Sequence, residues 1–425
     1  MWVALFAVSG SAWAQDAPPP PSVDAPAPAT SAQTLGALFD AVVEAIDKSF
    51  WDRERLAETG WLQQAGAVRP DVVAAASLQD AAVRINAFLG LLRMSHTVLL
   101  TRDDVEYYIL KSVFGNPVRF AGIGMFSVRI AGRDFVDAVL EGFPADRAGL
   151  KVGDEIVSVD GAPYHPVRSF RGKVGRQAAV AIRRSEGGDT RTLSAEIVSI
   201  EPLEAFADAM RSSARMIEHD GRRIGYMHVW ASTAGMEGVF AETLAKLGLI
   251  RERRQRQLGS SVAAPDALIV DMRGKIGGTS TVAARYLELI DPRGPNIVSR
   301  GPKPAPWGRF MRGRNAVLID HHTRSTGELF VHAYKRERQG PLIGTRTAGA
   351  VSAGWGVAMP GDTLLHVATT GLEVDGEILE GVGVAPDIEV QRPIPYANGH
   401  DPVIDAAVAE LVRRLDQGNR PVVSP

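Results

Sequence analysis

The sequence predicts a mixed α/β protein with more than one domain. Three observations indicate this: a helical pattern over 34–92, short strand-like segments with Gly/Asp turns over 116–200, and strands alternating with helices from 201 onward. Alternation of strands with helices is typical of a layered α/β domain. A chain of 425 residues is also longer than one ordinary domain.

Composition narrows the class of protein. Apolar residues make up 45% of the chain and the net charge is −2, as in soluble globular proteins. A general nucleic-acid binder would be basic, so this class is disfavoured. The chain has no cysteine, which excludes disulfides, thiolate metal sites and a Cys nucleophile. The sequence gives no indication of a metal or an organic cofactor.

The N-terminus predicts export. Residues 1–14 form a short apolar run that ends in Ala12-Trp13-Ala14, a small-x-small cleavage pattern. This run is shorter than the roughly 20 apolar residues that a membrane span needs. Residues 15–33 are rich in Pro and Ala and predict an extended linker. We therefore expect a signal peptide, and a periplasmic or secreted protein without a membrane span.

The first predicted domain, 34–115, is helical. Apolar residues recur at spacings of three and four over 35–46, and again over 78–92. The second helical pattern ends at the polar stretch Met94-Ser95-His96-Thr97. The next module, 116–200, has the short alternating segments and turns of a β domain.

The third region, 201–425, alternates strands with helices. Predicted strands cover 224–229, 267–271, 317–319 and 342–343, and predicted helices cover 236–247, 281–289 and 327–334. A Gly-rich loop is expected over 344–356, followed by a hairpin over 364–378 that turns at Asp375-Gly376. Asp401 and Pro402 predict the start of a last helix. The charge run 251–257 is expected to be solvated.

Ser325 is the candidate nucleophile. It follows a buried strand and precedes a helix, which is how a strand-turn-helix corner presents a reactive hydroxyl near free backbone amides. A single Ser in a loop is more often only a capping or turn residue.

A Ser hydroxyl needs a neighbouring base, and His96 is the candidate. The alternative is that the Ser95-His96 pair only ends a helix or lies in a surface loop. His321 and His322 lie too close before Ser325 to turn back onto it, so we expect turn residues there. They could also suggest a metal site, but no further ligand cluster accompanies them.

Two further stretches complete the candidate site. The strand 267–271 runs into Gly277-Gly278, whose amides, with that of Thr326, could hold an oxyanion. A plain turn is the alternative. Glu380 could orient the histidine as the third member of a triad does. It could equally be an exposed carboxylate at a hairpin end, with Glu377 as a competitor for the role.

Residues 116–200 resemble a PDZ domain in motif order and spacing. The resemblance implies that the loop Gly122-Ile123-Gly124-Met125 binds the C-terminal carboxylate of a peptide that adds as a strand. The helix that usually flanks such a groove is poorly marked in this sequence.

Taken together, residues 34–410 resemble the tail-specific, or carboxyl-terminal processing, serine peptidase family, which includes the tricorn core protease. Four motifs of that family have matching positions in this chain. They are Asp271, Arg273, Gly277 and Gly278; Thr323, Ser325, Gly327 and Glu328; Gly344, Thr347 and Gly349; and 383–387. The resemblance implies a crotonase-like (ClpP/crotonase) spiral core with an N-terminal helical domain and an inserted PDZ-like domain.

The catalytic design implied by the resemblance is the tricorn-like one. The processing branch uses a Lys just after the Gly-x-x-Thr-x-Gly loop, but this chain has Ala350 there. The tricorn-like branch uses a Ser-His pair, a later Ser and a Glu, which Ser95, His96, Ser325 and Glu380 match in order. Lys275 stands where the family usually has Asn, and nothing in the resemblance gives it a role.

These features predict an exported serine endopeptidase that cleaves polypeptides near their C-terminus. In this design Ser325 attacks, His96 takes the proton, Ser95 and Glu380 orient the imidazole, and Gly277 and Thr326 bind the oxyanion. The alternative is a catalytically silent peptide-binding or scaffold protein on the same fold, since fold alone does not secure function. A carrier of small apolar ligands is a weaker alternative and would require an apolar cavity.

Overall fold

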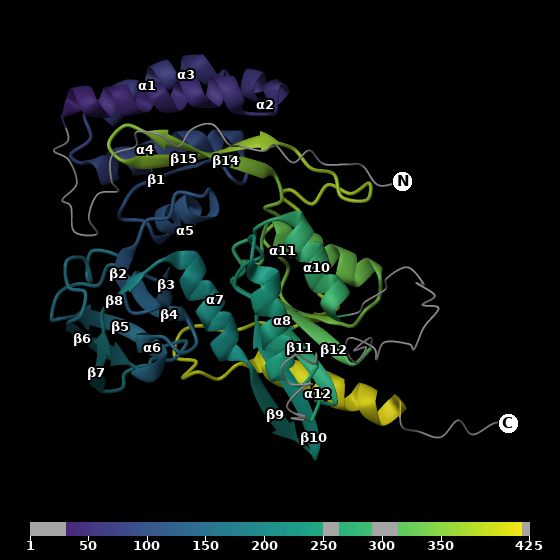
Figure 1. Ribbon diagram of the computed structural model, residues 1–425. Coiled ribbons are helices and arrows are strands. Elements are labelled where there is room, and N and C mark those ends of the chain that lie inside the picture. The colour runs from purple at the N-terminus through teal and green to yellow at the C-terminus, as the bar shows by residue number, and fades with distance from the viewer. Residues whose placement is uncertain (1–30, 250–262, 291–312, 419–425) are drawn as a thin grey trace.

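The computed structural model describes residues 31–249, 263–290 and 313–418. The expected signal peptide, the linker up to residue 30 and the charge run 251–257 lie outside these residues. The fold is mixed α/β, with N-terminal helices, a PDZ-like β domain and an α/β core (Figure 1). This confirms the predicted fold class. None of the helices within the described ranges is apolar and long enough to cross a bilayer.

The N-terminal helices cover a small sheet contributed mostly by distant residues. The helices are α1 (Ala32–Ser49), α2 (Arg53–Glu58), α3 (Trp61–Val73) and α4 (Leu78–Leu89), followed by the 3-10 turn η1 (Gly90–Leu92). Figure 1 shows α1 and α3 lying over the hairpin of β14 (Ala353–Met359) and β15 (Thr363–Thr370). The predicted apolar stripe of α1, including Leu38 and Val42, is buried in one cluster with Leu365 and Val367 of β15.

The strand β1 (Val98–Leu100) joins this sheet as its third member. It pairs antiparallel with β15, in a register that places Val98 opposite His366. This pairing places the polar stretch 94–97 at the edge of the C-terminal hairpin, although more than 250 residues separate the two in sequence.

The PDZ-like domain has its own sheet and core. Its five strands are ordered β3 (Met125–Ile130), β4 (Arg133–Val139), β5 (Glu155–Val159), β6 (Gln177–Arg183) and β7 (Thr190–Glu196), and all neighbours are antiparallel. A short ladder of β2 (Phe120–Gly122) and β8 (Val198–Ile200) closes its base. The helix α5 (Val105–Val113) leads into the domain, and the one-turn helix α6 (Pro144–Arg147) lies within it.

A six-stranded sheet forms the core. Its order is β16 (Ile388–Glu389), β13 (Leu342–Gly344), β12 (Asn315–Ile319), β11 (Ala267–Asp271), β10 (Arg222–His228) and β9 (Arg215–His219). Only β9 is antiparallel to its neighbour. The strands β11 and β12 are buried along their whole length, as expected for parallel strands covered on both faces.

Helices cover the two faces of this sheet. One face packs against α7 (Pro202–Ser213), α8 (Met236–Lys246), α10 (Ser280–Ile290) and α11 (Thr326–Arg336). The other packs against α12 (Pro402–Gly418). Asp401 caps α12 as predicted, because its carboxylate accepts the amides of Val403 and Ile404 at 3.1 and 3.2 Å.

The prediction for 344–378 was wrong in part. The expected Gly-rich loop contains the strand β14, and residues 363–370 pair with β14 and β1 rather than with a strand after residue 376. The turn at Asp375-Gly376 exists, with both residues at positive φ (53° and 84°), but it closes only the bridge Val374–Glu377. A local turn signal does not specify which distant strand a segment pairs with.

Candidate active site

Ser325 occupies the strained corner between β12 and α11. Its φ and ψ are 55° and −126°, which is unusual for a residue other than glycine. The corner is held in place because the amide of Ser325 donates a 2.8 Å hydrogen bond to the carbonyl of Ala350. The hydroxyl therefore sits beside the N-terminus of α11, as the sequence predicts.

The turn before Ser325 is fixed by a buried hydrogen-bond network. Asp320 accepts the amides of His322 and Thr323 at 3.0 Å, and also the amide of Gly274 at 3.2 Å. The Thr323 hydroxyl donates to the carbonyl of Met272 at 2.9 Å. His322 thus serves as a turn residue, and the described ranges contain no cluster of three or more His, Asp or Glu arranged for a metal.

Ser95, His96 and Glu380 form one hydrogen-bonded chain. The Ser95 hydroxyl lies 2.7 Å from His96 Nδ1 and donates to Glu380 Oε2 at 3.0 Å. Glu380 Oε1 also accepts the amide of Ser95 at 2.8 Å. The amides of Val351 and Ser352 donate to Glu380 Oε2 at 2.9 and 2.8 Å. Glu380 therefore joins the end of the N-terminal helical region to the loop that holds Ser325.

The surroundings keep His96 neutral. Burial lowers the pKa of His96 to about 4, with the positive charge of Arg324 acting in the same direction and Glu380 opposing it. The ring of His366 lies edge-on at 4.8 Å, and burial lowers the pKa of His366 to about 3. Burial alone would raise the pKa of Glu380, but hydrogen bonds from Ser352 and Ser95 outweigh it and lower this pKa. At neutral pH the His96 imidazole is therefore neutral and the Glu380 side chain is an ionised carboxylate.

Ser325 and His96 are connected through the intervening loop. Ala350 accepts the Ser325 amide, and the next residue, Val351, donates to Glu380, which bonds the Ser95-His96 pair. Among the residues that the structure describes, no hydrogen bond joins the Ser325 hydroxyl to His96. Catalytic hydrogen bonds in ligand-free sites are often long and tighten when substrate binds.

Gly277 lies directly against Ser325. A Cβ atom at Gly277 would fall 2.8 Å from Ser325 Cβ and 3.1 Å from its Oγ, and the φ of Gly277 is 104°. A side chain at Gly278, whose φ is 143°, would collide with the backbone of Ser232. Within the described ranges the amides of Gly277 and Thr326 have no hydrogen-bond acceptor. Both amides therefore remain available as donors beside Ser325.

Glu328 is a structural residue of the site for which the sequence suggested no role. Its buried carboxylate accepts the Thr347 hydroxyl at 2.6 Å and the amides of Gly349 and Ala350 at 2.7 Å each. Burial raises the pKa of Glu328, and these hydrogen bonds partly offset the effect. Glu328 thereby fixes the loop whose carbonyl at Ala350 holds Ser325.

Asp271 and Arg273 anchor the other loop. Arg273 pairs with Asp271 at 2.6 Å and with Asp401, at the start of α12, at 2.8 Å. Burial alone would raise the pKa of Asp271, but the charge of Arg273 outweighs it and keeps this pKa well below its usual range. The sequence identified both residues only as motif positions, since the partner Asp401 is distant in the chain.

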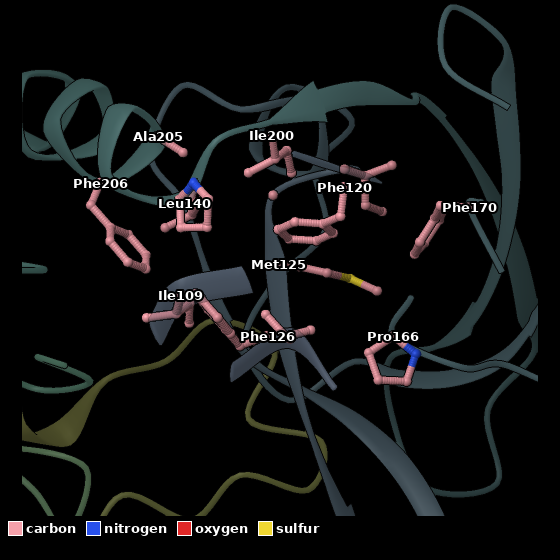
Figure 2. A pocket seen from close by; sticks show the side chains of 15 residues that line it. Ile109, Phe120, Met125, Phe126, Leu140, Pro166, Phe170, Ile200, Ala205 and Phe206 are labelled. Atoms are coloured by element: carbon pink, nitrogen blue, oxygen red, sulfur yellow. The ribbon is translucent and has the colours of Figure 1, made fainter. Parts of the chain in front are cut away.

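The predicted peptide-binding loop lines an apolar pocket. Gly122, Ile123, Gly124 and Met125 form one wall, and Figure 2 shows the side chains that surround them. Aromatic and aliphatic residues from α5, α7, β2 and the turn at 166–172 supply other walls; examples are Ile109, Phe206, Phe120 and Phe170. No helix flanks the groove on the side of residues 166–173, which form turns. The helices α5 and α7 instead cover this end of the domain.

A partly buried ion pair joins the PDZ-like domain to the core. Glu141, just after β4, lies 2.8 Å from Nδ1 of His228 and accepts the indole N–H of Trp230 at 2.9 Å. His228 Nε2 lies 2.9 Å from the carbonyl of Arg273, in the loop that leads to Gly277. Burial alone would lower the pKa of His228, but Glu141 and Asp271 outweigh it and raise this pKa. The domain contact is thus connected to the candidate oxyanion loop.

Comparisons with known proteins extend these observations. Residues 223–390 match peptidase family S41, and residues 135–180 match the PDZ domain. The chain is 29% identical over 288 residues to tricorn protease homolog 1 of Streptomyces coelicolor, covering 64% of this chain and 25% of that protein. It is 25% identical over 295 residues to carboxy-terminal processing protease CtpA of Bacillus subtilis, covering 65% of this chain and 58% of that protein. The chain therefore spans about a quarter of the tricorn relative and over half of CtpA.

Solved structures show the same fold. The crystal structure of the tricorn protease superposes with a TM-score of 0.52 at 22% identity, covering 91% of this chain and 37% of that chain. Mature CPAF complexed with lactacystin superposes with a TM-score of 0.50 at 14% identity, covering 91% of this chain and 99% of that chain. At these identities the likeness concerns the fold alone.

Proposed function

Since this chain belongs to peptidase family S41 and carries a PDZ domain, we propose that it is a serine endopeptidase that cleaves polypeptides near their C-terminus. Ser325 is the nucleophile, His96 is the general base, and Ser95 and Glu380 position the imidazole. The amides of Gly277 and Thr326 receive the oxyanion.

One observation carries the proposal, namely the bridge that the Ser95 hydroxyl makes between Glu380 and His96. This hydroxyl has a single proton and donates it to the Glu380 carboxylate, which can only accept. Its contact with His96 Nδ1 is therefore one in which the ring donates N–H. The neutral imidazole then has its lone pair on Nε2, which is the form that a general base requires.

The reaction follows from this arrangement. Ser325 Oγ forms a bond to the carbonyl carbon of the peptide while its proton moves to Nε2 of His96. The oxyanion that develops on the carbonyl oxygen is held by the amides of Gly277 and Thr326. His96 then protonates the leaving amine as the peptide C–N bond breaks. Water, deprotonated by the same imidazole, hydrolyses the acyl ester and restores Ser325.

The preference for C-terminal substrates rests on the pocket in the PDZ-like domain. Its loop, Gly122 to Met125, presents backbone groups beside an apolar pocket. This arrangement suits a peptide whose C-terminal residue has a free carboxylate and an apolar side chain. The Bacillus subtilis relative is named a carboxy-terminal processing protease, which supports the same substrate class.

A labelled fluorophosphonate, mapped by mass spectrometry, tests the nucleophile. The probe should modify Ser325 in the wild-type protein and leave Ser325→Ala unlabelled and inactive toward polypeptides, with its circular dichroism unchanged. The matched control is Ser194→Ala, at an exposed position on β7, which should label like the wild type. Hydrolysis that survives in Ser325→Ala would overturn the proposal.

A catalytically silent peptide-binding protein is the second candidate. It is favoured by Ala350 at the position of the usual lysine, and by the lack of a hydrogen bond between His96 and Ser325 among the described residues. This candidate predicts that C-terminal peptides bind while the fluorophosphonate labels no residue. The peptidase predicts both binding and labelling.

Export is part of the proposal and rests on the apolar run 1–14 and its Ala12-Trp13-Ala14 ending. A mature protein recovered from the periplasm or medium should begin at Gln15 when its N-terminus is sequenced. Recovery of the uncleaved chain from the cytoplasm would contradict export.

A further inference from the structure

Lys275 is a buried cation in the candidate oxyanion loop that the proposed reaction does not yet use. Its side chain is fully enclosed, at 0% exposure. Its Nζ donates to the Ser232 hydroxyl at 2.8 Å, the Thr326 hydroxyl at 3.2 Å and the Gly277 carbonyl at 3.3 Å. Two of these partners belong to the residues whose amides are assigned to the oxyanion.

The cluster ties three chain segments together behind the site. Ser232 donates its amide to Gly277 O at 2.8 Å, and its hydroxyl lies 2.8 Å from the Thr326 hydroxyl. Lys275 therefore braces the Gly277 loop, the segment after β10 and the first residue of α11 against one another. The relative position of the two free amides depends on this brace.

The charged groups around Lys275 are all engaged elsewhere. On its own loop Asp271 and Arg273 pair with each other, and on the neighbouring corner Asp320 and Glu328 accept backbone amides and threonine hydroxyls. Arg324 contacts Lys275 through its backbone amide, which donates to the Lys275 carbonyl at 3.3 Å. In the described part of the chain no carboxylate bonds Nζ. Burial without a counter-ion lowers the pKa of Lys275 to about 7.

A purely structural role explains this lysine poorly. Burying an unpaired cation is costly, and an apolar side chain of similar volume would fill the same space without that cost. Nor does the geometry make Lys275 a substitute base, because its three hydrogen bonds go to Ser232, Thr326 and Gly277 and not to Ser325.

We propose that Lys275 is a positioning residue for the oxyanion: its amine sets the spacing of the Gly277 and Thr326 amides and places positive charge behind them. This inference rests on the proposed peptidase function. In its ammonium form Lys275 stabilises the negative charge that develops on the substrate carbonyl, and it does so without contacting the substrate.

The test compares the wild type with Lys275→Met, which keeps the volume and removes the charge. We expect kcat and the rate of fluorophosphonate labelling to fall by about tenfold or more, since loss of one direct oxyanion donor costs about 100-fold or more. KM should change by less than about twofold, because Nζ does not face the peptide. Thermal stability should be unchanged or higher, because a buried charge is removed.

The pH dependence of kcat separates positioning from simple packing. The ammonium form exists below the pKa of Lys275, so wild-type kcat should step down as pH rises through about 7. Lys275→Met should lack this step while it keeps the rise at lower pH that belongs to His96. A step that persists unchanged in Lys275→Met would overturn the inference.

The Ser232→Ala variant provides the second arm: it completes a double-mutant cycle with Lys275→Met, and it serves by itself if Lys275→Met does not fold. Ser232→Ala removes one partner of Nζ, so it should lower kcat by a smaller factor and add little to the effect of Lys275→Met. Wild-type kcat in either folded variant would overturn the inference. The Ser325→Ala variant distinguishes failure of the proposed function from failure of this inference. Its activity tests whether the protein is a serine peptidase, and that result does not depend on the role of Lys275.

Discussion

Glu380 accepts both the amide and the hydroxyl of Ser95, at 2.8 and 3.0 Å, across 285 residues of sequence. The same carboxylate accepts two amides of the loop that follows Ala350. One side chain therefore sets the position of the histidine relative to the loop that holds Ser325. This relationship leads directly to the first prediction.

Glu380→Gln should lower kcat about 10- to 100-fold, with little change in KM. Either orientation of the amide places its NH₂ group against at least one backbone N–H, that of Ser95 or those of Val351 and Ser352, so the network that positions Ser95 beside His96 is disrupted. Steady-state kinetics on a polypeptide substrate measures the effect. Glu377→Gln is the matched control, because Glu377 is exposed and should leave kcat unchanged.

The acid limb of the kcat–pH profile should lie near pH 4. Burial lowers the pKa of His96 to about 4, and only the neutral ring can accept the Ser325 proton, so kcat rises as pH increases through this value. Arg324→Gln removes a positive charge that lowers the pKa of His96, so the limb should move to higher pH. Arg191→Gln, on the exposed strand β7, should leave it in place. An unmoved limb in Arg324→Gln would contradict this electrostatic contribution.

Gly277→Ala should abolish activity while the protein still folds. The new Cβ would fall 2.8 Å from Ser325 Cβ, and the φ of 104° is strained for alanine. We expect a loss in kcat of more than about 100-fold, measured with the labelling assay as well as by hydrolysis. Gly238→Ala is the control: its Cβ would meet nothing within 4 Å, and in the first turn of α8 it should stabilise the fold by up to about 1 kcal/mol.

Glu328→Gln should reduce stability by about 1–3 kcal/mol, because one of the three buried donors loses its acceptor. Urea unfolding monitored by circular dichroism gives this free energy. Glu186→Gln, at an exposed turn of the PDZ-like domain, should change stability by less than about 0.5 kcal/mol. Equal stability of the two variants would show that Glu328 does not hold the loop.

Glu141→Gln should loosen the contact between the PDZ-like domain and the core. Because the pKa of His228 is raised in the folded protein, its pairing with Glu141 contributes fully below pH about 6.5 and is lost as pH rises through the raised value. Hydrogen exchange in β10 should therefore be faster in the variant than in the wild type at pH 6, with a smaller difference at higher pH. A difference that does not depend on pH would contradict a role for the His228 charge.

Much of the candidate site could be predicted from local sequence. The apolar strand before Ser325, the helix after it and the two glycines after 267–271 are local signals, and the structure has each where predicted. The hydrogen bonds of Glu328, Lys275 and Arg273 could not be predicted this way, because each joins segments from different parts of the chain. A buried polar side chain gives no local periodicity that would reveal its partner.

By itself the sequence determined the fold class, the strand-turn-helix corner at Ser325 and the helix cap at Asp401. These depend on apolar periodicity, on conformations that favour glycine and on side chains that bond their own neighbours. Only the tertiary structure decided that β1 pairs with β15, that β14 is a strand, and that Ser95, His96 and Glu380 meet. The physical reason is that strand pairing depends on burial shared between distant segments, since each strand gains its partner and its covered face only once the whole chain has folded.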